Sequence, residues 1–313
     1  MRHRAAIVGL GQVGMKFDRD PKRTGVWTHF RAYEHLNELY DLAAVCDPDE
    51  ESLRCAVERK PGLMTYTDLD ELLENETLDV VSLCTPPELH IGQIMKCREH
   101  VKGILLEKPL GGTAEEAAGA VEACEQSGTL LLVNYYKRFD GAVPQFRRLM
   151  EAGRIGQVRH VTGYYSGPVE AVGSHLIDLC LYLFGPMKLE HRTGADTAAS
   201  AVFRLERGGT LGLMSTGCRE DLVFEVDAIG SEGRLRLMDN CARVESWTFQ
   251  TSRRYDNYRE LNLEPCEGGA VAERFLPLFE EMHEGLLGSR TVFTSDGRSA
   301  LVSQRLLMEM MTA

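Results

Sequence analysis

Two segments of this chain carry side chains suited to acid–base chemistry. Lys108 lies in Glu107-Lys108-Pro109, directly after the apolar run 103–106, and His175 lies three residues before Asp178. A lysine can stabilise a developing oxyanion, and it can also move a proton if burial lowers its pKa. Histidine is the usual general acid or base near neutral pH, and a spacing of three places His175 and Asp178 on one face of a helix. The two segments therefore predict proton transfer beside a stabilised oxyanion.

Each of these residues also has an ordinary structural interpretation. A lysine before a proline at a strand end is commonly solvated, and a histidine near a helix start is commonly hydrogen-bonded to the helix N-terminus. Pro109 restricts Lys108 to an extended backbone, which helps to hold the lysine side chain at the strand tip. The choice depends on whether the surrounding elements form a ligand site.

The N-terminal half has the pattern of a doubly wound α/β domain. Gly9-Leu10-Gly11-Gln12-Val13-Gly14 follows the apolar run 5–8 with G-x-G-x-x-G spacing. Glycine makes up 30 of the 313 residues, so an ordinary tight turn is the alternative for this segment alone. Further apolar runs, each leading into a helical pattern, occur at 42–47, 64–66, 80–85, 103–106 and 130–134. Continuous rather than alternating apolarity predicts parallel strands covered on both faces.

Ligands bind such sheets outside the carboxyl ends of the strands, where the polar residues of this chain gather. The glycines would let backbone N–H groups approach a pyrophosphate, and Asp47 could accept hydrogen bonds from the ribose hydroxyls. A carboxylate there repels a 2′-phosphate, so NAD is favoured over NADP, which stays open. Asp47 could also serve as a helix N-cap ahead of Pro48.

The spacing between the glycine turn and Asp47 is unusually long. Asp47 follows Gly14 by 33 residues (47 − 14), whereas about 20 are expected. Residues 16–27 are polar and aperiodic, so we interpret them as an insertion, with Thr28 capping a helix at 29–39. The insertion contains four basic residues, Lys16, Arg19, Lys22 and Arg23. They could cover the cofactor or meet an anionic substrate, or they could form a solvated surface loop.

In this order, five segments resemble the Gfo/Idh/MocA oxidoreductase family over nearly the whole chain. They are the glycine turn, Cys84-Thr85-Pro86-Pro87-Glu88-Leu89-His90, Glu107-Lys108-Pro109, Asn134-Tyr135-Tyr136-Lys137-Arg138-Phe139 and Gly173-Ser174-His175-Leu176-Ile177-Asp178-Leu179. The resemblance implies an N-terminal Rossmann domain and an α+β C-terminal domain with an open, mostly antiparallel sheet. It also implies oxidation or reduction of a hydroxyl or carbonyl on a sugar, cyclitol, nucleotide sugar or similar small molecule, in a homodimer or homotetramer joined through the second sheets.

The strand ends and the resemblance together define the predicted site. We expect Lys108 and His175 to be catalytic. The expected cofactor contacts are Gly9, Gly11, Gln12, Val13, Gly14, Asp47, Thr85, Pro86, His90, Glu107 and Lys108. The expected substrate contacts are Lys108, Tyr136, Arg138, Tyr165, His175 and Asp178. Two alternatives remain: His90 caps the following helix, and the basic residues after the sixth strand lie on the surface.

One position departs from the family pattern. Members with the dehydrogenase triad carry an aspartate four residues before the histidine, and that position is Ala171 here. Glu170 is adjacent but points elsewhere on a regular backbone. Tyr164, Tyr165 and Asp178 are candidate substitutes, although a structural role is favoured for each of them. The departure motivates one alternative to the dehydrogenase, a dinucleotide-sensing protein of the same fold. A separate alternative is an enzyme using tightly bound NAD for transient oxidation in elimination or glycoside cleavage.

The second half reads differently from the first. Alternating segments predict strands at 157–165, 201–205, 210–215, 223–229, 234–238 and 242–249, with helices at 173–183 and 273–287. Strands clustered after an α/β half indicate a separate α+β domain. We therefore divide the chain into a dinucleotide-binding domain at 1–128 and a substrate-binding and oligomerisation domain at 129–313.

The composition predicts a protein of the cytoplasm. The net charge of −12 disfavours binding to nucleic acids or anionic membranes. Arg2-His3-Arg4 leads directly into the first strand, without a signal peptide, and no apolar stretch reaches 18 residues. The nine cysteines form no C-x-x-C pair, which indicates free thiols in a reducing compartment and no metal site.

Overall fold

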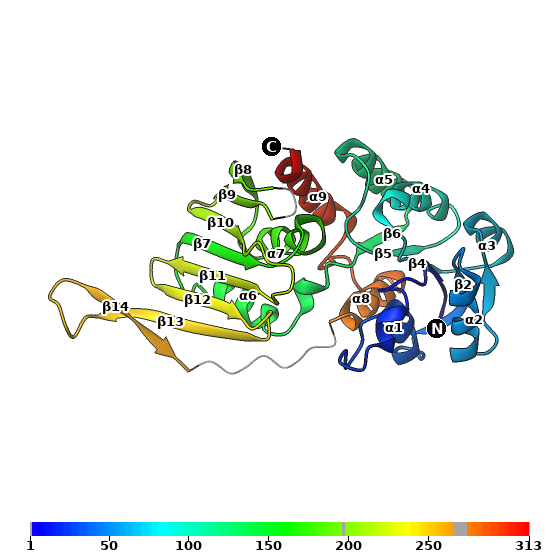
Figure 1. Cartoon of the computed structure of the whole chain (residues 1–313), viewed down its shortest axis with the longest axis horizontal. Helices are drawn as coiled ribbons and strands as arrows, with labels where there is room; N and C mark the ends of the chain where they lie inside the picture. Colours follow the sequence, from blue (N-terminus) through cyan, green and yellow to red (C-terminus); the bar gives the residue numbers. More distant parts are fainter. Residues whose placement is uncertain (1, 196–197, 266–273, 313) are drawn as a thin grey trace. The chain divides into compact units, whose positions relative to one another are not determined.

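The computed structural model describes residues 2–195, 198–265 and 274–312. The chain divides into two compact units (Figure 1). The N-terminal unit contains Met1–Tyr136 and Glu273–Gln304, and the C-terminal unit contains Lys137–Ala272 and Arg305–Ala313.

The N-terminal unit is built on a six-stranded parallel sheet, as the sequence predicts. Its strands are β1 (His3–Val8), β2 (Tyr40–Cys46), β3 (Met64–Tyr66), β4 (Val80–Leu83), β5 (Gly103–Leu106) and β6 (Leu130–Val133). Their order is β3-β2-β1-β4-β5-β6, so the strand order reverses between β1 and β4. In an open α/β sheet, this reversal marks the position where a ligand binds.

Helices cover both faces of this sheet. They are α1 (His29–His35), α2 (Glu50–Arg59), α3 (Leu69–Asn75), α4 (Pro87–Cys97), α5 (Ala114–Ser127) and α8 (Leu276–Leu286), with a short 3-10 helix η1 (Lys16–Arg19). The apolar sides of α3, α4 and α5 pack on one face. On the other face, Tyr33 of α1 contacts Phe279 of α8 and hydrogen-bonds to Ser82 of β4. Side-chain caps begin several of these helices, including the reciprocal pair Thr113 and Glu116 at α5.

A late segment of the chain returns to the N-terminal unit. The Tyr40 hydroxyl donates to the Phe279 carbonyl of α8 at 2.6 Å, and Leu132 of β6 forms a β-bridge with Asp296. The predicted domain boundary assigns all of residues 129–313 to the second domain. In the structure, residues 274–304 belong to the N-terminal unit instead. The reason is the apolar face of α8, which buries Leu278, Phe279 and Met282 in that unit.

The C-terminal unit contains an eight-stranded, mostly antiparallel sheet. The strands are β7 (Val158–Tyr165), β8 (Met187–Thr193), β9 (Ser200–Leu205), β10 (Thr210–Ser215), β11 (Phe224–Gly230), β12 (Gly233–Met238), β13 (Arg243–Thr251) and β14 (Arg259–Glu264). They follow the order β14-β13-β12-β11-β7-β10-β9-β8, in which only β7 and β10 pair in parallel. The fold-class prediction is confirmed, although the sequence did not predict the two edge strands β8 and β14.

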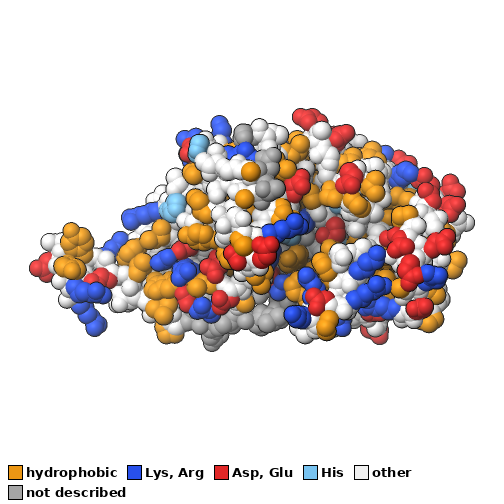
Figure 2. Space-filling model, in the orientation of Figure 1, with side chains coloured by type: hydrophobic (Ala, Val, Ile, Leu, Met, Phe, Trp, Pro, Cys, Tyr) orange, Lys and Arg blue, Asp and Glu red, His pale blue; other side chains and the backbone are white. Residues whose placement is uncertain are grey.

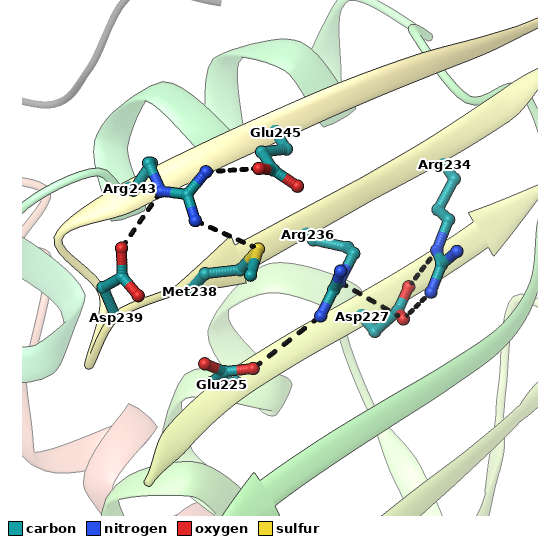
Figure 3. A network of polar contacts seen from close by, with 8 residues as sticks. All are labelled: Glu225, Asp227, Arg234, Arg236, Met238, Asp239, Arg243 and Glu245. Carbon is teal, nitrogen blue, oxygen red and sulfur yellow. Dashed lines mark hydrogen bonds and ion pairs between the residues drawn. The ribbon is translucent and has the colours of Figure 1, made fainter. Parts of the chain in front are cut away.

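One face of this second sheet packs on helices and the other carries charges. The core includes Phe146 of α6 (Val143–Glu151), Leu176 of α7 (Ser174–Phe184) and Leu307 of α9 (Gly297–Thr312). On the opposite face, arginines of β12 pair with carboxylates of the neighbouring β11, and Arg243 pairs with Glu245 within β13 (Figure 3). The remaining short elements are η2 (Tyr136–Phe139) and a π-helix, η3 (Val169–Gly173).

The described cysteines are free thiols, five of them buried. Cys266 lies outside the described residues. Within the part of the chain that the structure describes, no helix combines the length and the apolar character needed to cross a membrane.

Candidate active site

The glycine turn at the end of β1 has the geometry that its spacing predicts. Gly9 has φ +92°, and a Cβ there would lie 2.8 Å from the Cys84 carbonyl carbon. A Cβ on Gly14 would lie 2.1 Å from the Gly9 oxygen, whereas one on Gly11 would have no neighbour within 4 Å. Gly9 and Gly14 thus permit a tight turn and close packing, and Gly11 leaves its backbone open to a ligand. This arrangement fits a dinucleotide pyrophosphate.

A pocket of about 640 Å³ opens at the point where the strand order reverses. Residues that follow β1, β2 and β4 line it, among them Gly9, Gly11, Asp47, Thr85 and Pro86. The pocket therefore brings together five of the predicted cofactor-binding residues, and its walls are mainly apolar, as in most cofactor sites.

Asp47 lies at the rim of this pocket, beside the glycine turn. Its carboxylate accepts hydrogen bonds from the backbone N–H groups of Leu10, at 2.6 Å, and Asp49, at 2.9 Å. The N-cap of α2 is Asp49, not Asp47, because the Asp49 side chain accepts from the Glu51 N–H. Each Asp47 oxygen keeps a second lone pair, so the carboxylate fits a ribose hydroxyl. A contact between Asp47 and the ribose stays a prediction.

The long spacing before Asp47 comes from an insertion at residues 15–28. The carbonyls of Val13 and Gly14 accept hydrogen bonds from the N–H groups of His29 and Phe30, both at 3.0 Å. These contacts join the glycine turn to α1 across the insertion, and the Thr28 hydroxyl caps α1 by accepting from the Arg31 N–H. Thr28 as the helix cap is confirmed.

His90 joins the segments that follow β4 and β5. Its buried ring places Nδ1 2.8 Å from the Pro109 carbonyl oxygen and Nε2 2.9 Å from that of Thr85. Burial lowers the pKa of His90, outweighing the opposite effect of these carbonyls. Pro86 is the N-cap of α4, so His90 does not cap that helix. The Thr85 hydroxyl bonds to the Gln93 side chain at 2.5 Å.

Glu107 and Lys108 follow β5 at the same edge of the sheet. The Glu107 carboxylate is buried and accepts from Nε2 of His29, at 3.0 Å, and from the Asn134 amide, at 2.7 Å. Burial raises the pKa of Glu107, but these two donors and the positive charges of His29 and Lys108 outweigh burial and leave the pKa below its usual value. Lys108 is half-buried, and the peptide bond to Pro109 is cis.

Two predicted substrate contacts, Arg138 and Asp178, pair with each other in the C-terminal unit. Nε of Arg138 donates to Oδ2 of Asp178 at 2.8 Å, and a second guanidinium nitrogen contacts Oδ1. Both side chains are buried, and Lys137 is buried against Asp140. These basic residues therefore do not form a solvated surface. Their contact with substrate stays a prediction.

The other predicted substrate residues lie in different elements. His175 is the second residue of α7 and is 7% exposed. Tyr165 of β7 is buried, its hydroxyl donates to the Ala199 carbonyl, and burial raises its pKa to about 12. Tyr136 belongs to the N-terminal unit, where its ring stacks on Phe275. The sequence did not single out His29, the donor to Glu107, or Arg274, whose guanidinium lies over Tyr136.

The backbone around Ala171 is not regular, although the sequence analysis assumes a regular backbone there. Residues Val169–Gly173 form a π-helix, in which the Gly173 N–H bonds to the Pro168 carbonyl and the Ser174 N–H to the Val169 carbonyl. In a π-helix, residues five apart share a face. Within the described residues, no group of three or more His, Cys, Asp or Glu side chains could hold a metal ion.

Comparisons with known proteins agree with this geometry. Residues 3–135 match the family model Gfo/Idh/MocA, described as an oxidoreductase family with an NAD-binding Rossmann fold. The chain is 29% identical to scyllo-inositol 2-dehydrogenase (NAD(+)) of Bacillus subtilis over 51% of this chain and 44% of that protein. It is 26% identical to D-apiose dehydrogenase of Paraburkholderia graminis over 75% of this chain and 68% of that one. Several curated relatives are matched over only 39–44% of their own length.

Solved structures extend the likeness in fold to the whole chain. The WlbA dehydrogenase of Chromobacterium violaceum, in complex with NADH and UDP-GlcNAcA, superposes with a TM-score of 0.80 at 21% identity. The alignment covers 99% of this chain and 92% of that one. The likeness in sequence to the Gfo/Idh/MocA oxidoreductase model thus covers the NAD-binding Rossmann fold at residues 3–135, and the likeness in fold covers nearly the whole chain.

Proposed function

We propose that this protein is an NAD(P)-dependent dehydrogenase or reductase that acts on a hydroxyl or carbonyl group of a sugar, cyclitol, nucleotide sugar or similar small molecule. The observation that carries the proposal is the carboxyl edge of the first sheet. There the open glycine turn, Asp47 and Lys108 follow β1, β2 and β5. Relatives named for inositol and apiose, and a similar fold with a bound nucleotide sugar, support the substrate class.

The glycine turn and Asp47 would hold the dinucleotide, and the nicotinamide, when bound, supplies the hydride acceptor or donor. The Lys108 ammonium stabilises negative charge on the substrate oxygen while the hydroxyl proton leaves. His175 takes that proton in oxidation and returns it in reduction, or a neutral Lys108 amine takes it and becomes the ammonium that faces the oxygen. In its ammonium form, Lys108 helps to keep the buried Glu107 carboxylate ionised.

A lysine substitution with a matched control tests this proposal. Lys108→Ala is expected to lower turnover by about 100-fold or more while leaving NADH affinity nearly intact, because an oxyanion partner is lost. Lys102→Ala is the control, because Lys102 directly precedes β5, at the opposite end of that strand from Lys108, and is exposed and bonded to Asp79. The substrate panel contains scyllo-inositol, D-apiose and UDP-GlcNAcA, and nicotinamide fluorescence reports both binding and turnover. Unchanged turnover in Lys108→Ala would remove Lys108 from the mechanism.

Ala171 favours one other function, a protein of the same fold that senses the dinucleotide without catalysis. A sensor would bind NADH or NAD, but no member of the panel would change the redox state of the bound cofactor. If neither NAD(H) nor NADP(H) alters nicotinamide fluorescence or the thermal midpoint, both the dehydrogenase and the sensor are excluded.

A further inference from the structure

An alternating stack of arginines and aromatic rings lies in the N-terminal unit. The Arg23 Cζ is 3.9 Å from the centre of the Phe17 ring and 5.1 Å from that of Trp27. The Arg274 Cζ is 4.3 Å from the Trp27 ring and 5.7 Å from that of Tyr136. Trp27 and Tyr136 also meet edge to face, with centroids 6.5 Å apart. We call Phe17, Arg23, Trp27, Arg274 and Tyr136 the arginine–aromatic stack.

Stacking holds these guanidinium groups by their faces, and in Arg23 it leaves the edge for hydrogen bonding. Nε of Arg23 is 3.4 Å from the Asp20 carboxylate, and its other N–H groups have no hydrogen-bond partner in the described part of the chain. The Trp27 indole N–H donates to the Thr24 carbonyl at 2.8 Å, which fixes the ring between the two arginines. A guanidinium fixed in this way is prepared for a carboxylate or a phosphate, whose oxygens match its fork of donors.

The stack is not needed to hold the base of the insertion. Oδ2 of Asp18, which is buried, accepts from the Thr28 hydroxyl at 2.7 Å and from Nη1 of Arg59 at 2.6 Å. Thr28 also caps α1. Because these contacts anchor the insertion, the arrangement of three aromatic side chains and two arginines is available to bind a ligand.

The stack follows the ligand-binding edge of the first sheet. At one end, the N–H groups of Met15 and Lys16 bond to the Gly11 carbonyl of the glycine turn. At the other, Tyr136 lies two residues after Asn134, which bonds to Glu107 beside Lys108. Figure 2 shows Lys and Arg side chains gathered over the part of the N-terminal unit where α1 lies. In a chain of net charge −12, such a local cluster raises the concentration of anionic ligands.

We propose that the arginine–aromatic stack recognises an anionic group of the substrate, a carboxylate or a phosphate, while the reacting hydroxyl lies at Lys108. The proposal rests on the proposed function for the reacting end of the substrate. The anion-binding step is independent of hydride transfer and can be measured without turnover.

Titration calorimetry on the NADH-saturated protein tests the site. The probes are D-glucuronate with D-glucose, UDP-GlcNAcA with UDP-GlcNAc, and UDP alone. A carboxylate site binds each acid about 10-fold or more tightly than its neutral partner, whereas a phosphate site binds UDP and both nucleotide sugars alike. In either case Arg274→Gln and Arg23→Gln each weaken the preferred anion about 10-fold and leave NADH affinity unchanged.

Arg19→Gln is the matched control, because Arg19 is an exposed cation of the same insertion outside the stack. Arg23→Lys is a second variant that keeps the charge but loses the planar group, and an intermediate loss is expected. The proposal is overturned if no anionic probe binds at millimolar concentration, or if both glutamine variants bind the anions as the wild type does. Failure of Lys108→Ala to affect turnover would overturn the proposed function and leave the calorimetric result standing.

Discussion

Beneath Lys108, the buried carboxylate of Glu107 links three distant parts of the N-terminal unit. His29 opens α1, Glu107 follows β5 and Asn134 follows β6, and the two donors meet the same carboxylate oxygen. An ionised carboxylate only accepts hydrogen bonds, so Nε2 of His29 carries the proton in this contact. The network fixes the backbone from which Lys108 extends, and it therefore belongs to the positioning of the predicted catalytic residue.

Replacing His29 with leucine tests this network. We expect His29→Leu to lower the free energy of unfolding by about 2–3 kcal/mol at neutral pH, because a buried charge loses a donor. The wild-type pKa of Glu107 is depressed, so its contribution is present at neutral pH and is lost as the pH falls through that lowered pKa. In the variant the pKa of Glu107 rises, and protonation relieves the unpaired charge. The stability difference between the two proteins therefore shrinks as the pH is lowered.

Urea unfolding at several pH values measures this difference. His35→Leu is the control, because His35 lies in the same helix and is exposed, and a change within about 0.5 kcal/mol is expected. A stability difference that does not vary with pH would show that His29 acts through packing against Phe275 and Phe279 alone.

The sequence predicted which residues lie at the strand ends but not their partners. Glu107 and Asn134 could be placed at the ends of two strands because apolar runs precede them. The donor to Glu107, however, lies 78 positions earlier in the chain, beyond an insertion that hides the register of α1. Likewise, Arg138 and Asp178 were chosen as substrate contacts, and their mutual pairing across 40 positions depends on tertiary packing that no local pattern encodes.

At the level of elements, the buried strands were the predictable ones. β1, β2, β4 and β5 lie inside the parallel sheet and contain apolar runs because both of their faces are covered, whereas the predicted edge strand β3 is largely exposed. By contrast, β8 and β14 are the two edges of the second sheet and carry Lys188, Glu190, Arg259 and Glu264 among few apolar residues. Polar edge strands avoid unwanted pairing, and the same polarity hides them in the sequence.

The π-helix before α7 changes which residue lies one turn before His175. Glu170 lies five residues before His175, and on an α-helix that spacing would place the two side chains on different faces. Across the π-helical turn at Val169–Gly173, however, residues five apart follow one another along the same face. The backbone therefore presents Glu170 where a regular helix would present residue 171, and we expect Glu170 to orient His175.

Glu170→Gln is expected to lower kcat by about 10-fold without changing NADH affinity, because the imidazole loses an orienting carboxylate. The acid limb of the kcat/KM profile should also move to lower pH, since a nearby carboxylate favours the protonated imidazole. Adding Ala171→Asp should restore both properties. Glu190→Gln is the control, because Glu190 is exposed on β8 and paired with Arg204. An unchanged pH profile in Glu170→Gln would refute this role.

For the whole molecule, the charged face of the second sheet is the surface that a second copy would cover. Arg234 pairs with Asp227, Arg236 lies 3.7 Å from Asp227 and 3.9 Å from Glu225, and Arg243 pairs with Glu245 (Figure 3). The pairs between β12 and β11, and the Arg243–Glu245 pair within β13, neutralise the arginines of the face before any association. Apolar groups accompany them, including Tyr164, which is 41% exposed, and Leu263, which is 62% exposed. Compensated charges with exposed aromatic and aliphatic groups suit a protein interface.

We therefore expect a homodimer or homotetramer that a charge reversal on this face disrupts. Arg236→Glu brings a third carboxylate beside Asp227 and Glu225, and in an interface repeated by symmetry this repulsion occurs twice. Exposed ion pairs contribute only about 0–1 kcal/mol to folding, so the variant should stay folded while it dissociates. Arg147→Glu on α6, where Arg147 pairs with Glu151, is the control on the helical side. Light scattering coupled to gel filtration measures the mass of each protein in solution. The predicted assembly is contradicted if the wild-type protein is a monomer, or if the Arg236→Glu variant keeps the wild-type mass.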